Sequence, residues 1–507
     1  MNTVIIDCYT DEPSGLGVPP YLGVYPRYVF GALSTAGHAC HYLRIDDLRA
    51  TFKPRHASPK TNIAVLNTTK NFKDTERLLK AAKLIIVIAG IHTPGKYLSA
   101  IPGSLKELST LLMPFKQPKL LVGPAVMGSS QQGGRVVKSN HLDFIPVHNW
   151  KGVLEFLSEQ PITGIWAYPE LSKIAVKGAK ILSQLRLPLI AELETGRGCP
   201  RTPGCSFCTE PLKNRLAWRD PSQIIEEAKA LKSHGCLHFR LGKQTDFYSY
   251  KSVNQIHRLL SGLASLKPKT LHIDNVNPAK VPNPEGRLIT ELIVKHCTSG
   301  NVAAMGVESF DPIVCKENNI NSDPDTTLKA IRLINKLGAI RGENGMQKFL
   351  PGINLILGLK AESKQTLKIN LNALHHILNS GLLLRRINIR QVEVFPGTAM
   401  AEVGMKYLRK NKSHYFRFRK AVREQIDHNM LKKLAPAGTI LKEVFMEVHD
   451  GNNSFGRQFG SYPLIVGVKQ KLELRQFYNL RIKSHMLRSL VGESIEIIKP
   501  IQNSFEP

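Results

Sequence analysis

Apolar runs and amphipathic helical segments alternate along residues 1–165. The segment Val24–Thr35 has the spacing of a helix, and the apolar runs around it are typical of buried strands. Four such runs predict strands: Val4–Ile6, His41–Arg44, Leu84–Ala89 and Lys119–Val122. Strands, glycine loops and helices in alternation are typical of a doubly wound α/β fold. We therefore expect a Rossmann-like domain over residues 1–165, although no GxGxxG fingerprint follows its first strand.

A second α/β pattern covers residues 187–405, where amphipathic helices such as Pro221–Ser233 and Asp325–Leu337 separate apolar runs. The runs that predict strands are Leu187–Glu192, His238–Leu241, Thr270–Ile273, Ala303–Val307, Gly352–Leu357 and Ile387–Val394. Regular repetition of strand and helix favours a parallel barrel of the TIM type, here partial, with its site at the C-terminal ends of the strands.

The residues after this pattern form two segments that differ in composition. Residues 406–435 are rich in lysine and arginine with interleaved aromatics, and they predict a basic helical linker. Residues 436–507 contain short alternating runs punctuated by glycine, which favour a small antiparallel β-barrel. The expected strands are Leu441–Val448, Leu464–Val468 and Phe477–Ser484.

Charge and apolar content limit the possible partners and location. The chain of 507 residues has a formal net charge of +29, which favours polyanionic partners, nucleic acid first. A general basic bias of the source proteome is the alternative. No apolar run approaches the ~20 residues of a membrane span, and the N-terminus lacks the basic region of a secretory signal. We expect a cytoplasmic protein that does not enter a membrane.

Three of the eight cysteines lie within ten residues, in Glu194–Cys208. This segment follows the first predicted barrel strand, where a barrel places reactive groups. Thiolates from Cys199, Cys205 and Cys208 could bind three irons of a cubane and leave the fourth iron open. Structural zinc is the main alternative, but it needs four ligands, and Cys236 and His234 lie far along the chain. The scattered cysteines are expected to be buried apolar residues.

The cysteine segment and its surroundings resemble the radical SAM superfamily. The family's usual spacing is CxxxCxxC, and here the first interval is two residues longer. Further family landmarks follow in order, and the resemblance implies that they bind S-adenosylmethionine (SAM). The candidate cofactor-binding residues are Phe207, Gly242, Gln244 and Asp246 (in Arg240–Asp246), Glu308 (in Gly306–Ser309), Gly358 (in Pro351–Leu359, followed by Glu362) and Arg390 (before Phe395–Thr398).

These landmarks also have structural interpretations. Glu308 could form an ion pair at the barrel mouth, Asp246 could cap a helix, and Gly358 could serve a tight turn. Arg385, Arg386 and Arg390 could form a solvated or phosphate-binding stripe in place of substrate ligands. No side chain that acts directly on the substrate can be named from the sequence.

The whole chain is similar to an uncharacterised, mainly archaeal radical SAM family. The similarity is carried by Tyr9–Pro20, His449–Asn452 and Phe455–Pro463. Relatives often end in a helix-hairpin-helix, and no such motif follows Gly492. The first domain resembles a cobalamin-binding domain, although Gly90–Gly95, with His92, lacks the aspartate of the DxHxxG signature. The domain thus has two interpretations: it binds cobalamin, or it is a vestigial or substrate-positioning domain.

The C-terminal residues resemble a TRAM-like RNA-binding barrel, with a structural β-domain as the alternative. Candidate phosphate contacts are Arg457, Tyr462, Arg475, Arg481, Lys483 and Arg488. The resemblance implies a [4Fe–4S] enzyme that cleaves SAM to a 5′-deoxyadenosyl radical, with ferredoxin or flavodoxin as a reductant. RNA is the expected substrate. Two alternatives are a cobalamin-dependent methylase acting on protein or a small molecule, and a non-catalytic RNA-binding protein with a structural metal.

Overall fold

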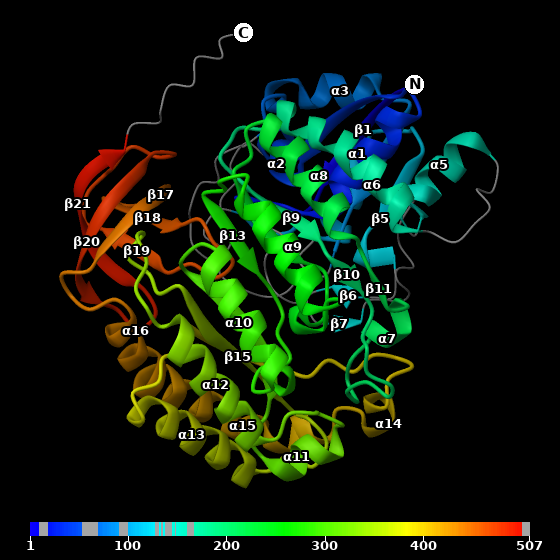
Figure 1. Cartoon of the computed structure of the whole chain (residues 1–507). Coiled ribbons are helices and arrows are strands. Elements are labelled where there is room, and N and C mark those ends of the chain that lie inside the picture. The colour runs from blue at the N-terminus through cyan, green and yellow to red at the C-terminus, as the bar shows by residue number, and fades with distance from the viewer. Residues whose placement is uncertain are drawn as a thin grey trace. The chain divides into compact units, whose positions relative to one another are not determined.

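The computed structural model describes residues 1–9, 19–52, 69–90, 100–126, 131–132, 135–136, 144–147, 149–159 and 167–498 (Figure 1). The chain divides into two compact units. Unit 1 comprises Met1–Leu193, Arg219–Phe239 and Leu266–Pro268. Unit 2 comprises Glu194–Trp218, Arg240–Ser265 and Lys269–Pro507. His92 and most of the Tyr9–Pro20 motif lie outside the described residues.

Unit 1 is built on a five-stranded parallel sheet in the order β3-β1-β4-β5-β8. Its strands are β1 (Asn2–Asp7), β3 (Ala39–Arg44), β4 (Leu84–Ile88), β5 (Lys119–Val122) and β8 (Ile145–Pro146). The accompanying helices are α1 (Val24–Thr35), α2 (Ile45–Phe52), α3 (Thr75–Ala81), α4 (Leu105–Leu112), α5 (Trp150–Ser158), α6 (Tyr168–Gly178) and α8 (Pro221–Ser233). The expected doubly wound α/β arrangement is confirmed.

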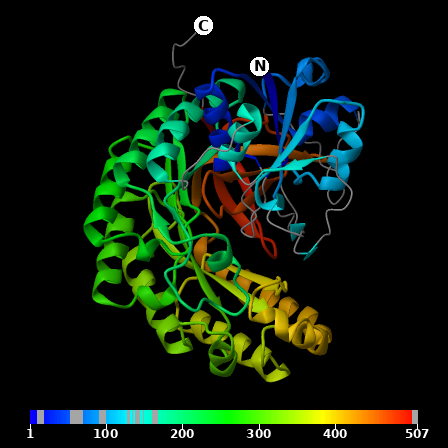
Figure 2. The same ribbon diagram turned by 90° about the vertical axis from the view of Figure 1, so that its right-hand side faces the viewer.

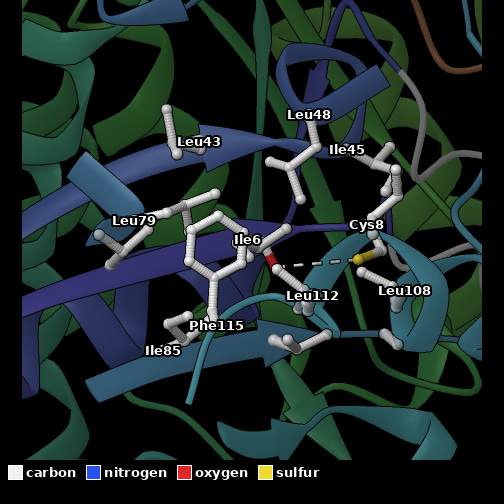
Figure 3. Packing of buried hydrophobic residues seen from close by; sticks show 14 of the residues in the cluster. Ile6, Cys8, Leu43, Ile45, Leu48, Leu79, Ile85, Leu108, Leu112 and Phe115 are labelled. Carbon is white, nitrogen blue, oxygen red and sulfur yellow. Dashed lines mark hydrogen bonds between the residues drawn. The ribbon is translucent and has the colours of Figure 1, made fainter. Parts of the chain in front are cut away.

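The core of this sheet follows from the alternation of side chains along its strands. Val4, Ile6 and Cys8 point to one face, where they pack on the apolar sides of α2, α3 and α4 (Figure 3). Leu108 and Leu112 of α4 are both buried in this cluster. Cys8 is thus a small buried side chain, as the sequence predicted for a scattered cysteine.

A buried ionic cluster ties the helices of unit 1 together. Glu227 of α8 accepts ion pairs from Arg27 of α1 and from Arg219, and all three side chains are fully buried. Arg27 also donates to the carbonyl oxygen of Glu192. Burial alone would raise the pKa of Glu227, but the two guanidinium groups outweigh it and lower that pKa. The charges are therefore held in the ionised state by one another.

Six strands occur in the succession expected for a partial barrel: β9 (Ile190–Glu194), β12 (His238–Gly242), β13 (Thr270–Ile273), β14 (Asn301–Glu308), β15 (Phe349–Leu357) and β16 (Arg386–Gln391). One sheet has the order β13-β12-β9-β2, where β2 (Tyr21–Leu22) pairs in parallel with β9. The other is the parallel sheet β14-β15-β16. An isolated parallel bridge between Val276 and Met305 joins β14 to the residues that follow β13.

Helices separate these strands along the chain: α8, α9 (Val253–Ala264), α10 (Pro284–His296), α11 (Pro312–Glu317), α12 (Pro324–Gly338) and α13 (Lys364–Asn379). In Figure 2 the green helices of unit 2 follow one side of its strands. Ile353 and Leu355 of β15 are fully buried beneath them, whereas Asn354 and Ile356 on the opposite face remain partly accessible. That second face is the lumen of the barrel.

After the barrel, α14 (Met400–Val403) leads to α15 (Lys406–Ala421), which continues through a π-helical segment, Val422–Asp427, into α16 (His428–Leu434). The predicted basic helix is confirmed over these residues. Tyr415 of α15 donates a hydrogen bond of 2.6 Å to Oε1 of Glu362, and Gly358 N–H donates to Oε2 at 2.9 Å. Asn411 completes this buried contact by donating to the Glu362 carbonyl oxygen.

The C-terminal strands close into a barrel in the order β17-β18-β19-β21-β20. They are β17 (Ile440–Asp450), β18 (Asn453–Gln458), β19 (Ile465–Val468), β20 (Phe477–His485) and β21 (Leu490–Ile498). The expected small barrel is confirmed, but it is not antiparallel throughout, since β19 and β21 pair in parallel. The strands β18 and β21 were not predicted. Within the described ranges, every helix is too short or too polar to cross a membrane.

We predict that Tyr415→Phe destabilises the fold in a pH-dependent way. Burial raises the pKa of Glu362 to about 7, and the Tyr415 hydroxyl opposes this rise. A raised folded-state pKa means stability that is present at low pH and lost as the pH rises through that pKa. Without the hydroxyl the pKa rises further, so the loss should be about 1–2 kcal/mol at pH 8 and smaller at pH 5.

Urea unfolding at the two pH values measures this difference. Tyr407→Phe on the same helix is the control, because its hydroxyl makes no hydrogen bond within the described part of the chain. Equal destabilisation of Tyr415→Phe at both pH values would contradict the role given to the carboxylate.

Candidate functional site

The cysteine loop leaves β9 and is closed at its base by a two-stranded ribbon. The strands β10 (Gly196–Arg197) and β11 (Ala217–Trp218) pair in antiparallel fashion on either side of it. A side chain at Gly196 would overlap the Trp218 ring, and Gly198 has a φ of +78°. Both glycines are therefore required by close approach or backbone conformation. The Gly198 N–H donates to Oε1 of Glu210 at 2.8 Å, which fixes the start of the loop.

Two adjacent asparagines after α11 hold the middle of the loop. The Asn319 amide donates to the carbonyl oxygens of Pro203 (2.8 Å) and Gly204 (2.9 Å). The Asn318 side chain accepts from Ser206 Oγ at 2.8 Å, and its backbone carbonyl accepts from Ser206 N–H at 3.0 Å. Asn319 has a φ of +51°, a conformation that asparagine tolerates better than most residues. No sequence signal indicates this role, because the two residues resemble an ordinary helix C-terminus.

The three thiols lie within electrostatic reach of one another. Burial, together with negative charge on Cys205 and Cys199, raises the pKa of Cys208 to about 11. Burial also raises the pKa of Cys205, which Arg201 opposes by donating to Sγ at 2.9 Å. Ionised thiolates of Cys205 and Cys208 therefore require additional positive charge, which metal binding supplies as it releases the thiol protons.

The cysteine loop supplies three sulfur ligands, one fewer than structural zinc needs. Thiolates of a cubane bind different irons, so three of them can hold a cluster and leave one iron open. The donor set, three cysteines on one anchored loop, fits a cluster of this kind better than the structural zinc considered from the sequence.

Glu308 provides an unsatisfied polar group beside the cysteine loop. It ends β14 after a register shift and has a φ of +61°. Its Oε2 atom is buried without a hydrogen-bond partner in the described structure, although the residue as a whole is partly accessible. Burial raises the pKa of Glu308 to about 8, against the influence of Arg390, and the charge of Glu308 raises the pKa of Cys205. A buried group without a partner at this position suits the polar atoms of a ligand such as SAM.

Three more candidates belong to the cysteine loop, to the turn after β15 and to β16. Phe207 packs on an apolar cluster that contains Leu359, Val392 and Met400. Gly358 has a φ of +93° and faces Leu408, so its turn does require glycine. Arg390 is paired in register with Ile356 and lies on the lumen face of β16. The structure thus brings Glu308, Arg390 and the cysteine loop together.

Gly242, Gln244 and Asp246 follow β12 and are engaged in hydrogen bonds within the protein. Thr195 N–H donates to the Gly242 carbonyl at 3.1 Å, and the Thr195 hydroxyl donates to Gln244 Oε1 at 3.0 Å. The Asp246 carboxylate accepts from Tyr248 N–H, Asn277 N–H and Ser249 Oγ, at 3.1, 2.9 and 2.5 Å. Asp246 therefore caps a 3₁₀ turn, as one interpretation of the sequence proposed. A contact of these residues with a cofactor stays a prediction.

Comparison with known proteins agrees with this site. The radical SAM superfamily description matches residues 193–368, which contain the cysteine loop and Glu308. The apo structure of OxsB, a cobalamin-dependent S-adenosylmethionine radical enzyme, has a similar fold, with a TM-score of 0.52 and 13% identity. That similarity covers 82% of this chain and 56% of OxsB. The chain is thus a radical SAM enzyme, a class that works with a [4Fe–4S] cluster and SAM.

Within that class the chain belongs to a family of archaeal proteins. It is 41% identical to the uncharacterized protein MJ0274 of Methanocaldococcus jannaschii, over 99% of this chain and 94% of that protein. It is 38% identical to an uncharacterized protein of Archaeoglobus fulgidus, over 98% of this chain and 90% of that protein. The archaeal family expected from the sequence is confirmed.

We predict that Asn319→Gly loosens the cysteine loop without unfolding the chain. Glycine keeps the positive φ but removes both amide donors to Pro203 and Gly204. The loss of about 1.4 kcal/mol of local stability corresponds to roughly tenfold faster amide hydrogen exchange across residues 203–208. Hydrogen exchange measured by mass spectrometry tests this directly, with or without a cluster.

Lys267→Gly is the matched control, because Lys267 is exposed and also has a positive φ, +54°. In Lys267→Gly, the rate of amide hydrogen exchange in the cysteine loop should equal that of the wild type. Unchanged exchange in Asn319→Gly would show that the loop is held by other contacts.

Proposed function

We propose that Cys199, Cys205 and Cys208 hold the [4Fe–4S] cluster and that SAM binds between this cluster, Glu308 and Arg390. When bound, the cluster and SAM supply one-electron cleavage that yields a 5′-deoxyadenosyl radical, which removes hydrogen from a substrate. The observation that carries this proposal is the anchored loop with three thiols beside the buried, unpartnered Oε2 of Glu308.

The residues of the chain have distinct tasks in this proposal. Arg201 favours the thiolate form of Cys205, and the asparagine contacts keep the loop backbone in place. Glu308 accepts hydrogen bonds from the SAM amine or ribose, and Phe207 offers an apolar surface to the adenine. Gly242, Gln244 and Asp246 shape the backbone after β12, and Gly358 keeps the turn after β15 narrow. A ferredoxin or flavodoxin would deliver the electron.

We predict that anaerobic reconstitution with iron and sulfide gives about four irons per chain. With dithionite, the reconstituted chain should release 5′-deoxyadenosine from SAM. Cys199→Ala, Cys205→Ala and Cys208→Ala should each lose at least about 100-fold of this activity, because a cubane with a missing ligand is not held. Iron analysis and chromatography of the products measure both quantities.

Cys40→Ala is the control, because Cys40 is remote in sequence from the loop and lies in β3 of unit 1. It should keep full iron content and activity. Stoichiometric zinc, or SAM cleavage that survives in the three variants, would overturn the ligand assignment.

RNA is our proposed substrate, and an exposed basic face on α15 supports this. Arg409, Lys412, Phe416 and Arg419 follow helical spacing and are exposed along one flank of the helix, beside the face that buries Leu408, Tyr415 and Phe418. Phe416 is 61% exposed, and the Arg419 guanidinium lies 5.2 Å from its ring centre. Cations beside an accessible aromatic ring suit phosphates and unstacked bases. We call these four residues the basic stripe.

The C-terminal barrel offers less of such a surface than the sequence suggested. Arg457 forms a two-point ion pair with Glu447, with nitrogen–oxygen distances of 2.6 and 3.1 Å. Arg481 and Lys483 are exposed but share Glu493. Tyr462 faces inward and bonds to Asp274 at 2.8 Å. The proposal for RNA therefore depends mainly on α15 and the net charge.

We predict that the triple variant Arg409→Gln/Lys412→Gln/Arg419→Gln weakens RNA binding. Each phosphate contact that is removed should lower the slope of log affinity against log salt by about one. Fluorescence anisotropy with a labelled transfer RNA at several salt concentrations gives this slope. The matched control is Lys329→Gln/Arg332→Gln/Lys336→Gln, which removes three exposed cations from one face of α12.

Equal effects of the two triple variants would mean that binding follows net charge alone. RNA binding that neither variant changes would remove the support that the basic stripe gives to an RNA substrate.

A cobalamin-dependent methylase is the second candidate. The parallel sheet of unit 1 and the fold shared with OxsB, a cobalamin-dependent enzyme, support it. Cobalamin absorbance retained after reconstitution with aquacobalamin and gel filtration would favour this candidate over the first.

A further inference from the structure

The loop between β18 and β19 of the C-terminal barrel reaches the N-terminal ends of the partial barrel's strands. Thr270, at the start of β13, donates to the Phe459 carbonyl at 3.3 Å. Ser461 N–H donates to Nδ1 of His272 at 3.2 Å, and Arg385 donates to the Tyr462 carbonyl. All of these residues belong to unit 2. The loop therefore forms a floor at the end of the lumen opposite the cysteine loop.

The Tyr462 side chain extends from this loop into the lumen. Its hydroxyl donates to Oδ1 of Asp274 at 2.8 Å, and the other carboxylate oxygen of Asp274 is paired with Arg240. The Arg386 guanidinium lies over the Tyr462 ring, 4.0 Å from its centre. Asp274 is thus already neutralised by Arg240. Arg386 instead stacks on an aromatic ring and forms no ion pair with Asp274.

Arg386 and its neighbour Arg385 lack a counter-charge. In the part of the chain that the structure describes, no carboxylate oxygen lies within 4.0 Å of either guanidinium. Burial lowers the pKa of Arg386, Tyr462 opposes this shift, and the positive charges of Arg390 and Arg488 add to it. Burial likewise lowers the pKa of Arg385 to about 9. Removing a cation from water is costly unless it is paired, so an anionic ligand would compensate the buried Arg385 and the partly accessible Arg386.

The strand register directs Arg386 into the lumen. Arg386, Asn388 and Arg390 alternate along β16 and pair with Gly352, Asn354 and Ile356 of β15. A Cβ on Gly352 would lie 3.0 Å from Cγ of Arg386, so the glycine leaves room for the arginine's stem. Four residues of strand separate Arg386 from Arg390, a span of roughly 13 Å. The distance between the floor and the SAM position is thus about the length of a small molecule or a nucleotide.

We propose that Arg386, oriented by Tyr462, binds an oxyanion of the substrate on this floor, either a phosphate or a carboxylate. The inference rests on the proposed radical SAM site and adds the chemical class of the substrate. Stacking on the phenol ring fixes the plane of the guanidinium, whose planar fork suits a two-point contact with the anion. The opposite end of the bound substrate then faces the SAM position, beside Glu308.

Calorimetric titration of the reconstituted full chain tests this proposal with three probes: inorganic phosphate, adenosine 5′-monophosphate and succinate. High salt is used so that exposed lysines and arginines contribute little. We expect at least one probe to bind, and Arg386→Gln to weaken it by about tenfold or more. Arg386→Lys keeps the positive charge but not the planar guanidinium, so its affinity for the probe should lie between those of the wild type and Arg386→Gln. Preference for the phosphates or for succinate identifies the oxyanion.

Arg332→Gln, an exposed arginine of α12, is the control and should bind the probes like the wild type. Absence of binding by all three probes, or equal affinity in Arg386→Gln, would overturn the proposal. SAM cleavage without substrate is measured in the same samples and should persist in Arg386→Gln. A wild type that binds the probes but cannot cleave SAM would contradict the proposed function and not the oxyanion site.

Discussion

The whole candidate site depends on how a loop with few large side chains is kept in one conformation. Its cysteines cannot position themselves, and the loop has no regular secondary structure between its closing ribbon and α7 (Glu210–Lys213). Hydrogen bonds from Asn318 and Asn319 to the loop backbone supply the missing order. The asparagines in turn are fixed by the barrel, since Asn318 also donates to the carbonyl of Lys360 after β15. The loop is thereby fastened to two barrel strands besides the one from which it leaves.

Charge inside the barrel is the second constraint. Ionic groups that are buried in a barrel lumen must be paired or supplied with ligands. Arg240 and Asp274 satisfy each other, and Tyr462 completes the carboxylate's hydrogen bonds. Glu308 at one end and Arg386 at the other are left with unused capacity. The pattern of satisfied and unsatisfied groups thus outlines where ligands are expected, from the mouth of the barrel to its floor.

Strong local signals made much of this architecture predictable from the sequence. Helix α1 and strands β5 and β13 have the predicted bounds, because clear apolar periodicity and Gly or Pro neighbours delimit them. Strand β18 was missed since its residues are mostly polar, and its Gly456 was interpreted as a turn. That glycine is needed within the strand, where any side chain would overlap the Phe445 carbonyl. The parallel pairing of β19 with β21 depends on tertiary closure and has no local signature.

The site was predictable from the sequence only where residues close together in the chain carry its chemistry. Three closely spaced cysteines indicate a metal without further information, and the family landmarks drew attention to Glu308. The contact of Tyr462 with Asp274 joins residues 188 positions apart, and no single sequence encodes such a pair visibly. The asparagine anchors were missed for the same reason, since the partners of Asn319 precede it by 115 or more residues.

The position of the floor loop late in the chain has a consequence for biogenesis. A nascent chain emerges from the ribosome with its N-terminus first, so all six barrel strands emerge before Tyr462 does. A barrel that formed before Tyr462 emerged would leave the Asp274 carboxylate and the Arg386 guanidinium facing water at its open end. The contacts of Tyr462 with both residues therefore make completion of the lumen depend on the last domain of the chain.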